Sequence, residues 1–130
     1  GGGSFGFEEL RGKWVLIASD SGACPEACVA KLTLLRQVRL MLGRKASRVV
    51  RVYVADDTRA MTPQALAPFE GTIAITVQPG TLLPLSAVND RAHIYLVDPL
   101  GNVMMRFPAD AEPRRMLRDL ERLLKASQVG

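Results

Sequence analysis

The sequence predicts an α/β domain in which helices flank a central mixed β-sheet. Two observations support this class: short apolar runs typical of strands alternate with segments of helical periodicity, and a turn rich in proline and glycine joins two late strands. A chain of 130 residues is long enough to bury a core of its own. We expect the glycine-rich residues 1–4 to be a flexible linker or an expression remnant, and residues 5–130 to form a single domain.

The first half of the chain predicts a strand, a helix and a second strand. Residues 14–18 form a continuous apolar run, which is typical of a strand buried on both faces. Apolar residues then recur at helical spacing over residues 28–42, which predicts a helix with Pro25 in its first turn and an end at Gly43. Residues 48–54 predict a second strand, and the helix between the two strands makes them parallel neighbours.

The second half of the chain predicts three strands and two helices. Its first strand alternates in polarity, the next two flank a turn, and the last segment carries an apolar stripe at helical spacing. The expected elements are a short helix at 63–66, a strand at 72–77, a loop at 78–91, hairpin strands at 92–97 and 103–107, and a closing helix from residue 112 onward.

The composition limits the classes of partner. The longest apolar runs are only a few residues, far below the roughly 20 that span a bilayer. The formal charge is +4, but aromatic residues make up only 5% and no groove-reading motif is present, so we expect no nucleic-acid partner. Much of the basic excess lies in one stretch, which suits an acidic protein or an anionic membrane surface: Arg36, Arg39, Arg44, Lys45, Arg48 and Arg51.

The only two cysteines, Cys24 and Cys28, form a C-x-x-x-C pattern where the first strand passes into the first helix. Roughly helical residues between them would separate their Cα atoms by about 6 Å, so the pair could form a disulfide. Such a bridge closes a very short loop and stabilises a fold little, which favours a redox or ligand role. The element order together with a cysteine pair at this junction is the thioredoxin layout.

The position of the cysteines predicts different roles for them. The N-terminus of a helix stabilises negative charge and lowers the pKa of a nearby thiol, although Glu26 would oppose this somewhat. We expect Cys24, at the exposed edge, to be the attacking thiolate or first ligand, and Cys28, one turn into the helix, to be the resolving thiol. Two reduced cysteines without any role remain the alternative.

Two thiolates at this spacing are also half of a soft-metal site, suited to Cu(I) or to zinc. The chain offers few further ligands. His93 is the only histidine and lies in a predicted strand, where a packed or surface side chain is the commoner outcome. We therefore treat Cys24, Cys28 and His93 as the candidate metal set and expect no cofactor to be required.

Three segments resemble the Sco/SenC family, and the similarity covers nearly the whole chain. They are Gly12-Lys13-Trp14-Val15-Leu16-Ile17, Cys24-Pro25-Glu26-Ala27-Cys28, and Tyr95-Leu96-Val97-Asp98-Pro99-Leu100-Gly101. Members of that family are thioredoxin-fold proteins that help assemble the binuclear copper site of cytochrome c oxidase. They face an extracytoplasmic space and are usually tethered by an N-terminal segment.

The resemblance implies a thioredoxin-like fold, a periplasmic or membrane-anchored location, and a tether that could have been removed from this chain. It also implies a partner protein that carries thiols or a copper site, either an oxidase subunit or a copper chaperone. Copper is an optional ligand in this interpretation. We expect a monomer.

The chain departs from the family at the third copper ligand. The family has a distal histidine in the step that here reads Val88-Asn89-Asp90, so Asp90 occupies the histidine position. A carboxylate is a poor Cu(I) ligand, which favours thiol chemistry over copper. The cis-proline of thioredoxin enzymes is also missing, which would leave Asp90 facing the cysteines, either moving protons during thiol exchange or hydrogen-bonding the loop.

The sequence therefore predicts an extracytoplasmic, Sco-like thiol-disulfide oxidoreductase that acts through Cys24 and Cys28, with Asp90 at the same site, in assembly of the oxidase copper site. One alternative is a copper metallochaperone whose third ligand has moved to His93 or a methionine. The other is a non-catalytic, thioredoxin-like docking domain that uses the basic face from Arg36 to Arg51.

Overall fold

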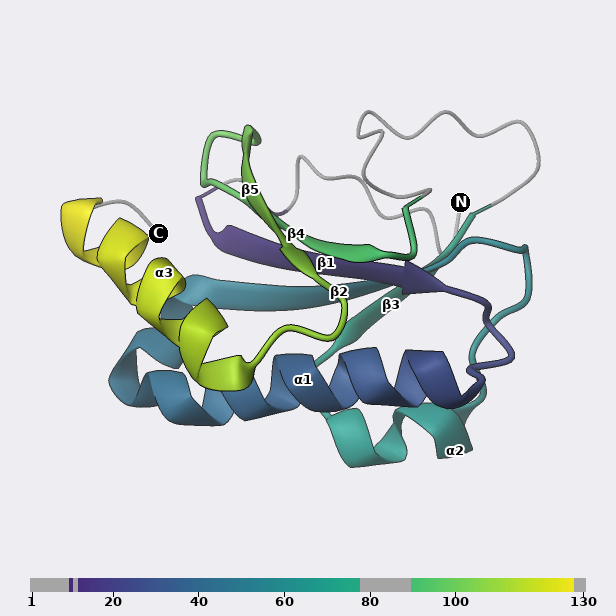
Figure 1. Cartoon of the computed structure of the whole chain (residues 1–130). Helices are drawn as coiled ribbons and strands as arrows, with labels where there is room; N and C mark the ends of the chain where they lie inside the picture. The colour runs from purple at the N-terminus through teal and green to yellow at the C-terminus, as the bar shows by residue number, and fades with distance from the viewer. Residues whose placement is uncertain (1–9, 11, 78–89, 128–130) are drawn as a thin grey trace.

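The computed structural model describes residues 10, 12–77 and 90–127 (Figure 1). Five strands form one mixed sheet, as the sequence predicts, and their order is β3-β2-β1-β4-β5. The strands are β1 (Trp14–Asp20), β2 (Val49–Ala55), β3 (Ile73–Thr76), β4 (His93–Val97) and β5 (Val103–Pro108). The helices are α1 (Glu26–Leu42), α2 (Pro63–Leu66) and α3 (Pro113–Ala126), with 3-10 turns η2 (Gly43–Arg48) and η3 (Ala67–Phe69).

The strand β1 is the centre of the sheet, and all seven of its residues are buried. It pairs with β2 in parallel, which confirms the expected β-α-β unit, and with β4 in antiparallel. The strand β2 pairs in parallel with β3, and β4 pairs in antiparallel with β5. Since β4 runs opposite to β1, β4 begins at the same end of the sheet at which β1 ends.

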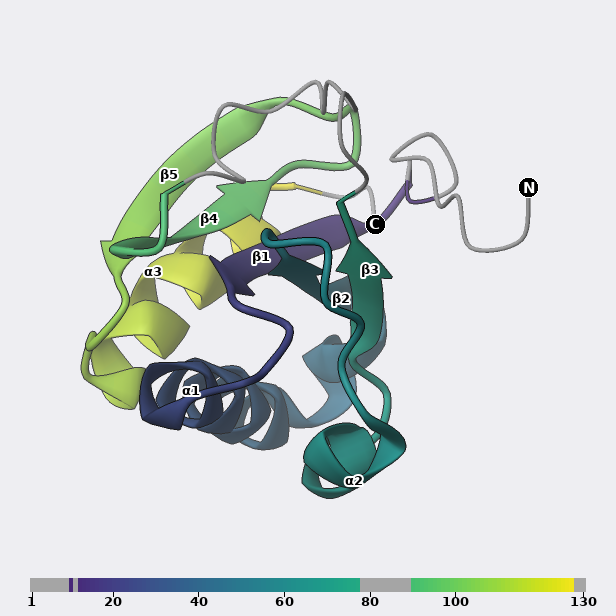
Figure 2. The same cartoon turned by 90° about the vertical axis from the view of Figure 1, so that its right-hand side faces the viewer.

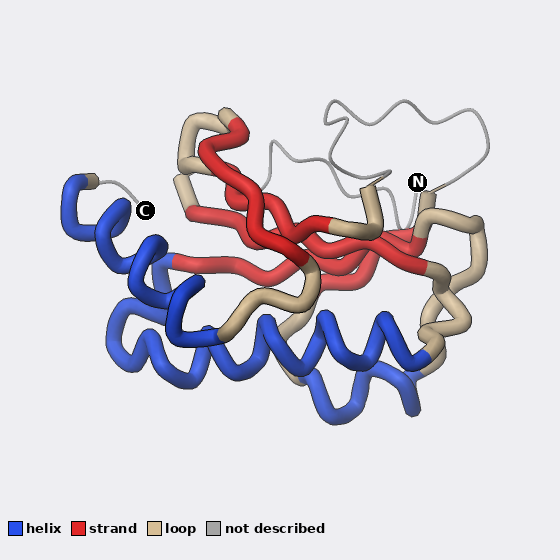
Figure 3. The backbone as a smooth tube through the Cα atoms, viewed as in Figure 1, coloured by secondary structure: helices blue, strands red, loops and turns tan. Residues whose placement is uncertain are grey.

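Both long helices, α1 and α3, pack on the same face of the sheet (Figures 2 and 3). Because side chains alternate along a strand, Leu16 of β1 faces these helices, while Val15 and Ile17 join a second cluster on the other face. The apolar stripe of α3 is buried through Met116, Leu120 and Leu124. No helix in the described part of the chain is long and apolar enough to cross a membrane.

Two element boundaries near the cysteines differ from the sequence prediction. The strand β1 continues to Asp20, two residues further than its apolar run, because the Asp20 carboxylate is buried in an ion pair. The helix α1 begins at Glu26, and Pro25 is its N-cap rather than part of the first turn. Of the loop expected at 78–91, residues 78–89 lie outside the described part of the chain.

The predicted basic face is corrected by the structure, because three of its arginines hold the fold together. Arg51 is only 3% exposed and donates to the carbonyl of Glu70 at 2.8 Å. Arg36 donates to the Pro68 carbonyl at 3.0 Å and lies over the ring of Phe69. Arg48 similarly donates to two carbonyl groups at the end of α3. These side chains reach backbone carbonyls that the sequence pattern cannot reveal.

Candidate active site

A disulfide joins Cys24 to Cys28, as the spacing allowed. The Cα atoms are 4.9 Å apart, closer than the helical expectation, because Cys24 precedes the helix and has a positive φ of 50°. Cys28 has no exposed surface and belongs to the main core cluster. Cys24 is half-buried at the edge of that cluster. Of the two sulfur-bearing residues, Cys24 is therefore the one that a partner can reach.

The N-terminus of α1 supports a negative charge beside Cys24. Its N-cap is Pro25, whose side chain cannot accept a hydrogen bond. The Pro25 carbonyl accepts from the N–H groups of Cys28 at 2.9 Å and Val29 at 3.2 Å. The N–H groups of the first helical turn carry the positive end of the helix dipole, which favours a thiolate over a thiol. The exposed carboxylate of Glu26 acts against this effect.

A buried ion pair lies behind the cysteines. The Lys31 Nζ atom is 2.8 Å from Oδ2 of Asp20 and donates to the Ser19 carbonyl at 2.9 Å. Both charged side chains are only 4% exposed. Burial alone would raise the pKa of Asp20, but the Lys31 hydrogen bond, the Ser21 N–H and the charges of Lys31 and Arg91 outweigh it and hold that pKa below its usual value.

Arg91 joins the segment before β4 to the ends of β1 and β2. Its guanidinium donates to both carboxylate oxygens of Asp56, at 2.8 and 2.5 Å, and lies 3.4 Å from Asp20. The hydrogen bonds with Asp56 are the main reason that the pKa of Arg91 lies above its usual value. Arg91 thereby adds a second cation beside Asp20 and ties the segment that leads into β4 to the ends of β1 and β2.

The loop between β1 and Cys24 is held by three contacts. The Asp57 carboxylate accepts from the Ser21 hydroxyl and from the Gly22 N–H at 2.9 Å. The hydrogen bond from Ser21, followed by that from Gly22, lowers the pKa of Asp57 to about 2. The Tyr53 hydroxyl donates to the Ser21 carbonyl at 2.7 Å, and burial raises the pKa of Tyr53.

Gly22 has a steric role in the same loop. A Cβ atom at this position would lie 1.6 Å from the carbonyl oxygen of Arg59, far inside van der Waals contact. Only glycine allows the loop to pack this closely against the segment after β2. Together with the Asp57 contacts, this packing fixes the path of the chain that leads to Cys24.

Asp90, the residue at the family's histidine position, is bound to its own segment. Its Oδ2 atom accepts from the Tyr95 hydroxyl at 2.6 Å and lies 2.8 Å from Nδ1 of His93, while Oδ1 accepts from the Ala92 N–H at 3.0 Å. The hydrogen bond from Tyr95, and after it the one from His93, holds the pKa of Asp90 below its usual value against partial desolvation. An ionised carboxylate acts here as an acceptor; a direct role at the thiols stays a prediction.

The candidate metal set is not assembled in this disulfide-bonded form. Among the described residues, no group of three His, Cys, Asp or Glu side chains converges to hold a metal ion. His93 is instead held by Asp90 and packs edge-on against Tyr95, with ring centres 6.3 Å apart. Met104 is largely exposed and Met105 packs against the core. The β4–β5 register shifts at Met104, so simple alternation along the strand does not assign the two methionines to opposite faces.

Sequence reasoning missed the polar network around Asp20. One signal was present: Lys31 lies three residues after Cys28, on the buried face of the predicted helix. A lysine on a buried helical face requires an anionic partner, and Asp20 lies two residues after the apolar run of β1. The contribution of Arg91 had no such signal, since it depends on how the chain returns to the sheet.

The fold and the disulfide at the β1–α1 junction define a thioredoxin-like protein. The chain belongs to the family described as "Transmembrane-like, thioredoxin-like, C-terminal domain", whose model matches residues 14–127. No curated protein sequence matches this chain.

Solved structures with the same fold include Sco proteins. Bradyrhizobium japonicum ScoI with copper bound is 23% identical, with a TM-score of 0.69, and the match covers 88% of this chain and 87% of that one. A SCO1/SenC family lipoprotein from Bacillus anthracis is 19% identical, with a TM-score of 0.66 and coverage of 92% and 86%. MTB dsbF, in its mixed oxidized and reduced forms, is 20% identical, with a TM-score of 0.61 and coverage of 89% and 84%. The resemblance to Sco/SenC proteins is thus confirmed in the fold.

Proposed function

We propose that this protein is a Sco-like thiol-disulfide oxidoreductase that exchanges electrons with the cysteines of a partner protein. The observation that carries the proposal is the disulfide at the start of α1, with one cysteine accessible and the other fully buried. A nucleophilic thiol must be reachable, and a resolving thiol needs only to reach its neighbour. The similarity of fold to MTB dsbF, a protein described in oxidized and reduced forms, supports redox chemistry of the pair.

The exchange has two steps. In the reduced protein, Cys24 loses its proton to water, and its thiolate attacks one sulfur of the partner's disulfide to form a mixed disulfide. The partner's S–S bond breaks, and the thiolate that it releases takes a proton from water. Cys28 then loses its proton and attacks the Cys24 sulfur of the mixed disulfide, which releases the second partner thiol. Two electrons pass to the partner, and the Cys24–Cys28 disulfide of the present structure is the product.

We place this chemistry outside the cytoplasm, in assembly of the copper site of cytochrome c oxidase. The description of the family as transmembrane-like supports a membrane-anchored location, as does the fold shared with a SCO1/SenC family lipoprotein. The partner is then an oxidase subunit or a copper chaperone that carries an oxidised cysteine pair. In this proposal Asp90 is a positioning residue, which holds His93 and Tyr95 at the end of the sheet where β1 also ends.

A redox titration tests the proposal. The protein is equilibrated in glutathione or dithiothreitol buffers of graded potential, and the fraction of Cys24–Cys28 disulfide is measured by thiol alkylation and mass spectrometry. We expect one two-electron transition above about −300 mV, the level below which structural disulfides usually lie. A disulfide that does not exchange with any of these buffers would contradict the redox function and favour a docking domain.

Delivery of copper is the second candidate, and the contact between Asp90 and His93 favours it. A carboxylate at Nδ1 is a common support for a ligating histidine, and it leaves Nε2 for a ligand. Binding would require reduction of the cysteines and movement of the His93 segment toward them, because the three do not converge in this form. Only a short segment would have to move. His93 is the first residue of β4, and Tyr95, two residues later, is already paired with Ile17 of the strand that leads to Cys24.

Anaerobic Cu(I) titration against a competing chelator tests this second candidate. The measurement compares the reduced wild-type protein with the variants Cys24→Ser and His93→Ala. Tight binding that is lost in both variants would support copper delivery through a three-ligand site. Equal competition by wild type and His93→Ala would exclude His93 as a ligand and leave the two thiols as the whole site.

A further inference from the structure

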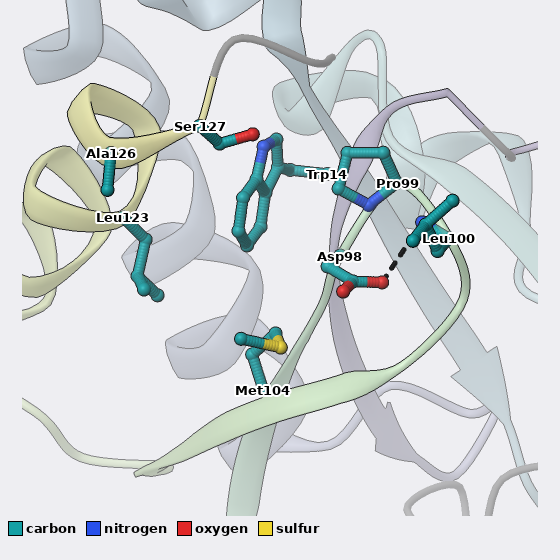
Figure 4. Close-up of a pocket in the computed structure, with 8 residues that line it drawn as sticks. All are labelled: Trp14, Asp98, Pro99, Leu100, Met104, Leu123, Ala126 and Ser127. Atoms are coloured by element: carbon teal, nitrogen blue, oxygen red, sulfur yellow. Dashed lines mark hydrogen bonds between the residues drawn. The ribbon is translucent and has the colours of Figure 1, made fainter.

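A second surface lies at the end of the sheet opposite the cysteines, where β1 begins (Figure 1). A pocket of about 310 Å³ opens there between the last turns of α3 and the turn that joins β4 to β5 (Figure 4). Its walls are mostly apolar, and the side chains that make them so are Trp14, Pro99, Leu100, Met104, Leu123 and Ala126. The Asp98 carboxylate at its edge accepts from the N–H groups of Leu100 and Asn102 within the turn.

The rim of this pocket exposes large apolar side chains. Leu100 at the tip of the turn is 73% exposed, and Met104 on the adjoining strand is 47% exposed. A single exposed apolar side chain is ordinary, but two that line the same apolar pocket form a patch. We call Leu100 and Met104 the apolar rim.

The helix next to the pocket carries a row of cations. Five exposed basic residues recur at three- and four-residue spacing on the face of α3 opposite its buried stripe. They extend over about 16 Å of helix, and no ion pair is recorded for them within the described ranges. We call this set the basic stripe: Arg114, Arg115, Arg118, Arg122 and Lys125.

The basic stripe borders the pocket and dominates the charge of the chain. Arg122 lies one turn before Ala126 and next to Leu123, two of the residues that line the pocket. The five charges of the stripe exceed the formal net charge of +4. Cations and exposed apolar side chains therefore meet where the C-terminal part of the basic stripe reaches the pocket.

We propose that this end of the domain docks on an anionic membrane surface. Stable attachment to a bilayer takes two signals, commonly one apolar and one polybasic, and the apolar rim and basic stripe supply both. An acidic protein partner would account for the basic stripe but not for the exposed apolar side chain of Leu100. The polypeptide also enters β1 at Trp14, inside this surface, so docking would hold the cysteines on the side away from the lipid, where a partner can reach them.

Vesicle flotation of the whole 130-residue chain tests the proposal. The vesicles contain phosphatidylcholine alone or phosphatidylcholine with phosphatidylglycerol, at low and high salt. We expect binding to the anionic vesicles that weakens at high salt, and a loss of more than about tenfold in Arg115→Glu/Arg122→Glu, since each basic residue near the surface is worth roughly fivefold. Leu100→Ser, a change at an exposed tip that should fold normally, is expected to weaken binding as well.

The matched control is Gln37→Glu/Arg39→Glu/Gln64→Glu, which changes the net charge equally at three exposed positions outside the basic stripe. Binding of this control should equal that of the wild type. Equal losses in the control and the stripe variant, or binding to polyglutamate but not to anionic vesicles, would overturn the proposal. Exchange of the disulfide with glutathione should be unchanged in all these variants, so a failure here is distinguishable from a failure of the redox function.

Discussion

Removing the buried lysine behind the cysteines should destabilise the fold strongly. In Lys31→Met, the apolar stem is kept and the ammonium that faces Asp20 at 2.8 Å is lost. At that distance the attraction is about 6 kcal/mol for an effective dielectric constant of about 20, and desolvation of the two ions offsets much of it in the intact pair. The variant keeps the burial cost of the carboxylate without its main partner, so the free energy of unfolding should fall by about 3–5 kcal/mol.

The pH dependence of this loss is a second signature. In the wild type, the lowered pKa of Asp20 means that its contribution to stability is complete above the usual pKa and is lost as the pH falls through the folded value. Without Lys31, its hydrogen bond and its charge no longer lower the pKa of Asp20, so this pKa is higher in the folded variant than in the folded wild type. The difference in stability between wild type and Lys31→Met should therefore shrink as the pH falls from the Asp20 pKa of the variant to the lower Asp20 pKa of the wild type.

Urea denaturation of the oxidised proteins, followed by circular dichroism, measures both effects. Lys45→Met is the matched control, because Lys45 pairs with Glu121 at 2.9 Å with both side chains more than a third exposed. That pair should contribute about 1 kcal/mol or less. Asp20→Asn in the Lys31→Met background should restore part of the stability. If Lys31→Met costs no more than Lys45→Met, the reasoning about the buried pair is wrong.

Three further changes test the loop that leads to Cys24. Tyr53→Phe removes the hydrogen bond to the Ser21 carbonyl and should lower the free energy of unfolding by about 1 kcal/mol in urea denaturation; no change would mean that this bond does not hold the loop. Gly22→Ala forces the loop away from the Arg59 carbonyl and should cost about 1–3 kcal/mol, whereas a neutral effect would show that the loop packs differently. In Asp57→Asn, the acid unfolding transition should become less steep between about pH 4 and 2. In the wild type, the depressed pKa of about 2 means that the contribution of the Asp57 carboxylate to stability is complete above its usual pKa and is lost as the pH falls through about 2. An unchanged profile would contradict the contact with Ser21.

The strands, the helices and the disulfide were predictable because each depends on a local pattern. The apolar run of β1, the helical spacing after Cys28 and the turn after β4 each indicate one element, and the structure contains all three. The spacing of Cys24 and Cys28 allowed a disulfide, and the structure contains it. These features need no knowledge of distant contacts.

The polar surroundings of the site were not predictable to the same extent. Arg51 and Arg36 look like solvated cations in the sequence, yet their guanidinium groups bind backbone carbonyls after α2. For Asp90 the sequence left open proton transfer at the cysteines or hydrogen bonds to its loop, and its hydrogen bonds within the described segments go to Ala92, His93 and Tyr95. Such partners are set by tertiary packing, which composition and periodicity do not encode.

The roles of the two cysteines can be tested most directly with single variants. Cys28→Ser leaves the half-buried Cys24 as the only thiol, and Cys24→Ser leaves the fully buried Cys28. Each variant is reacted at neutral pH with 5,5′-dithiobis(2-nitrobenzoate), and the rate of mixed-disulfide formation is recorded by absorbance. We predict that Cys24 reacts more than about tenfold faster than Cys28 and forms a stable adduct. Equal rates, or faster reaction of Cys28, would contradict the assignment of Cys24 as the attacking thiol.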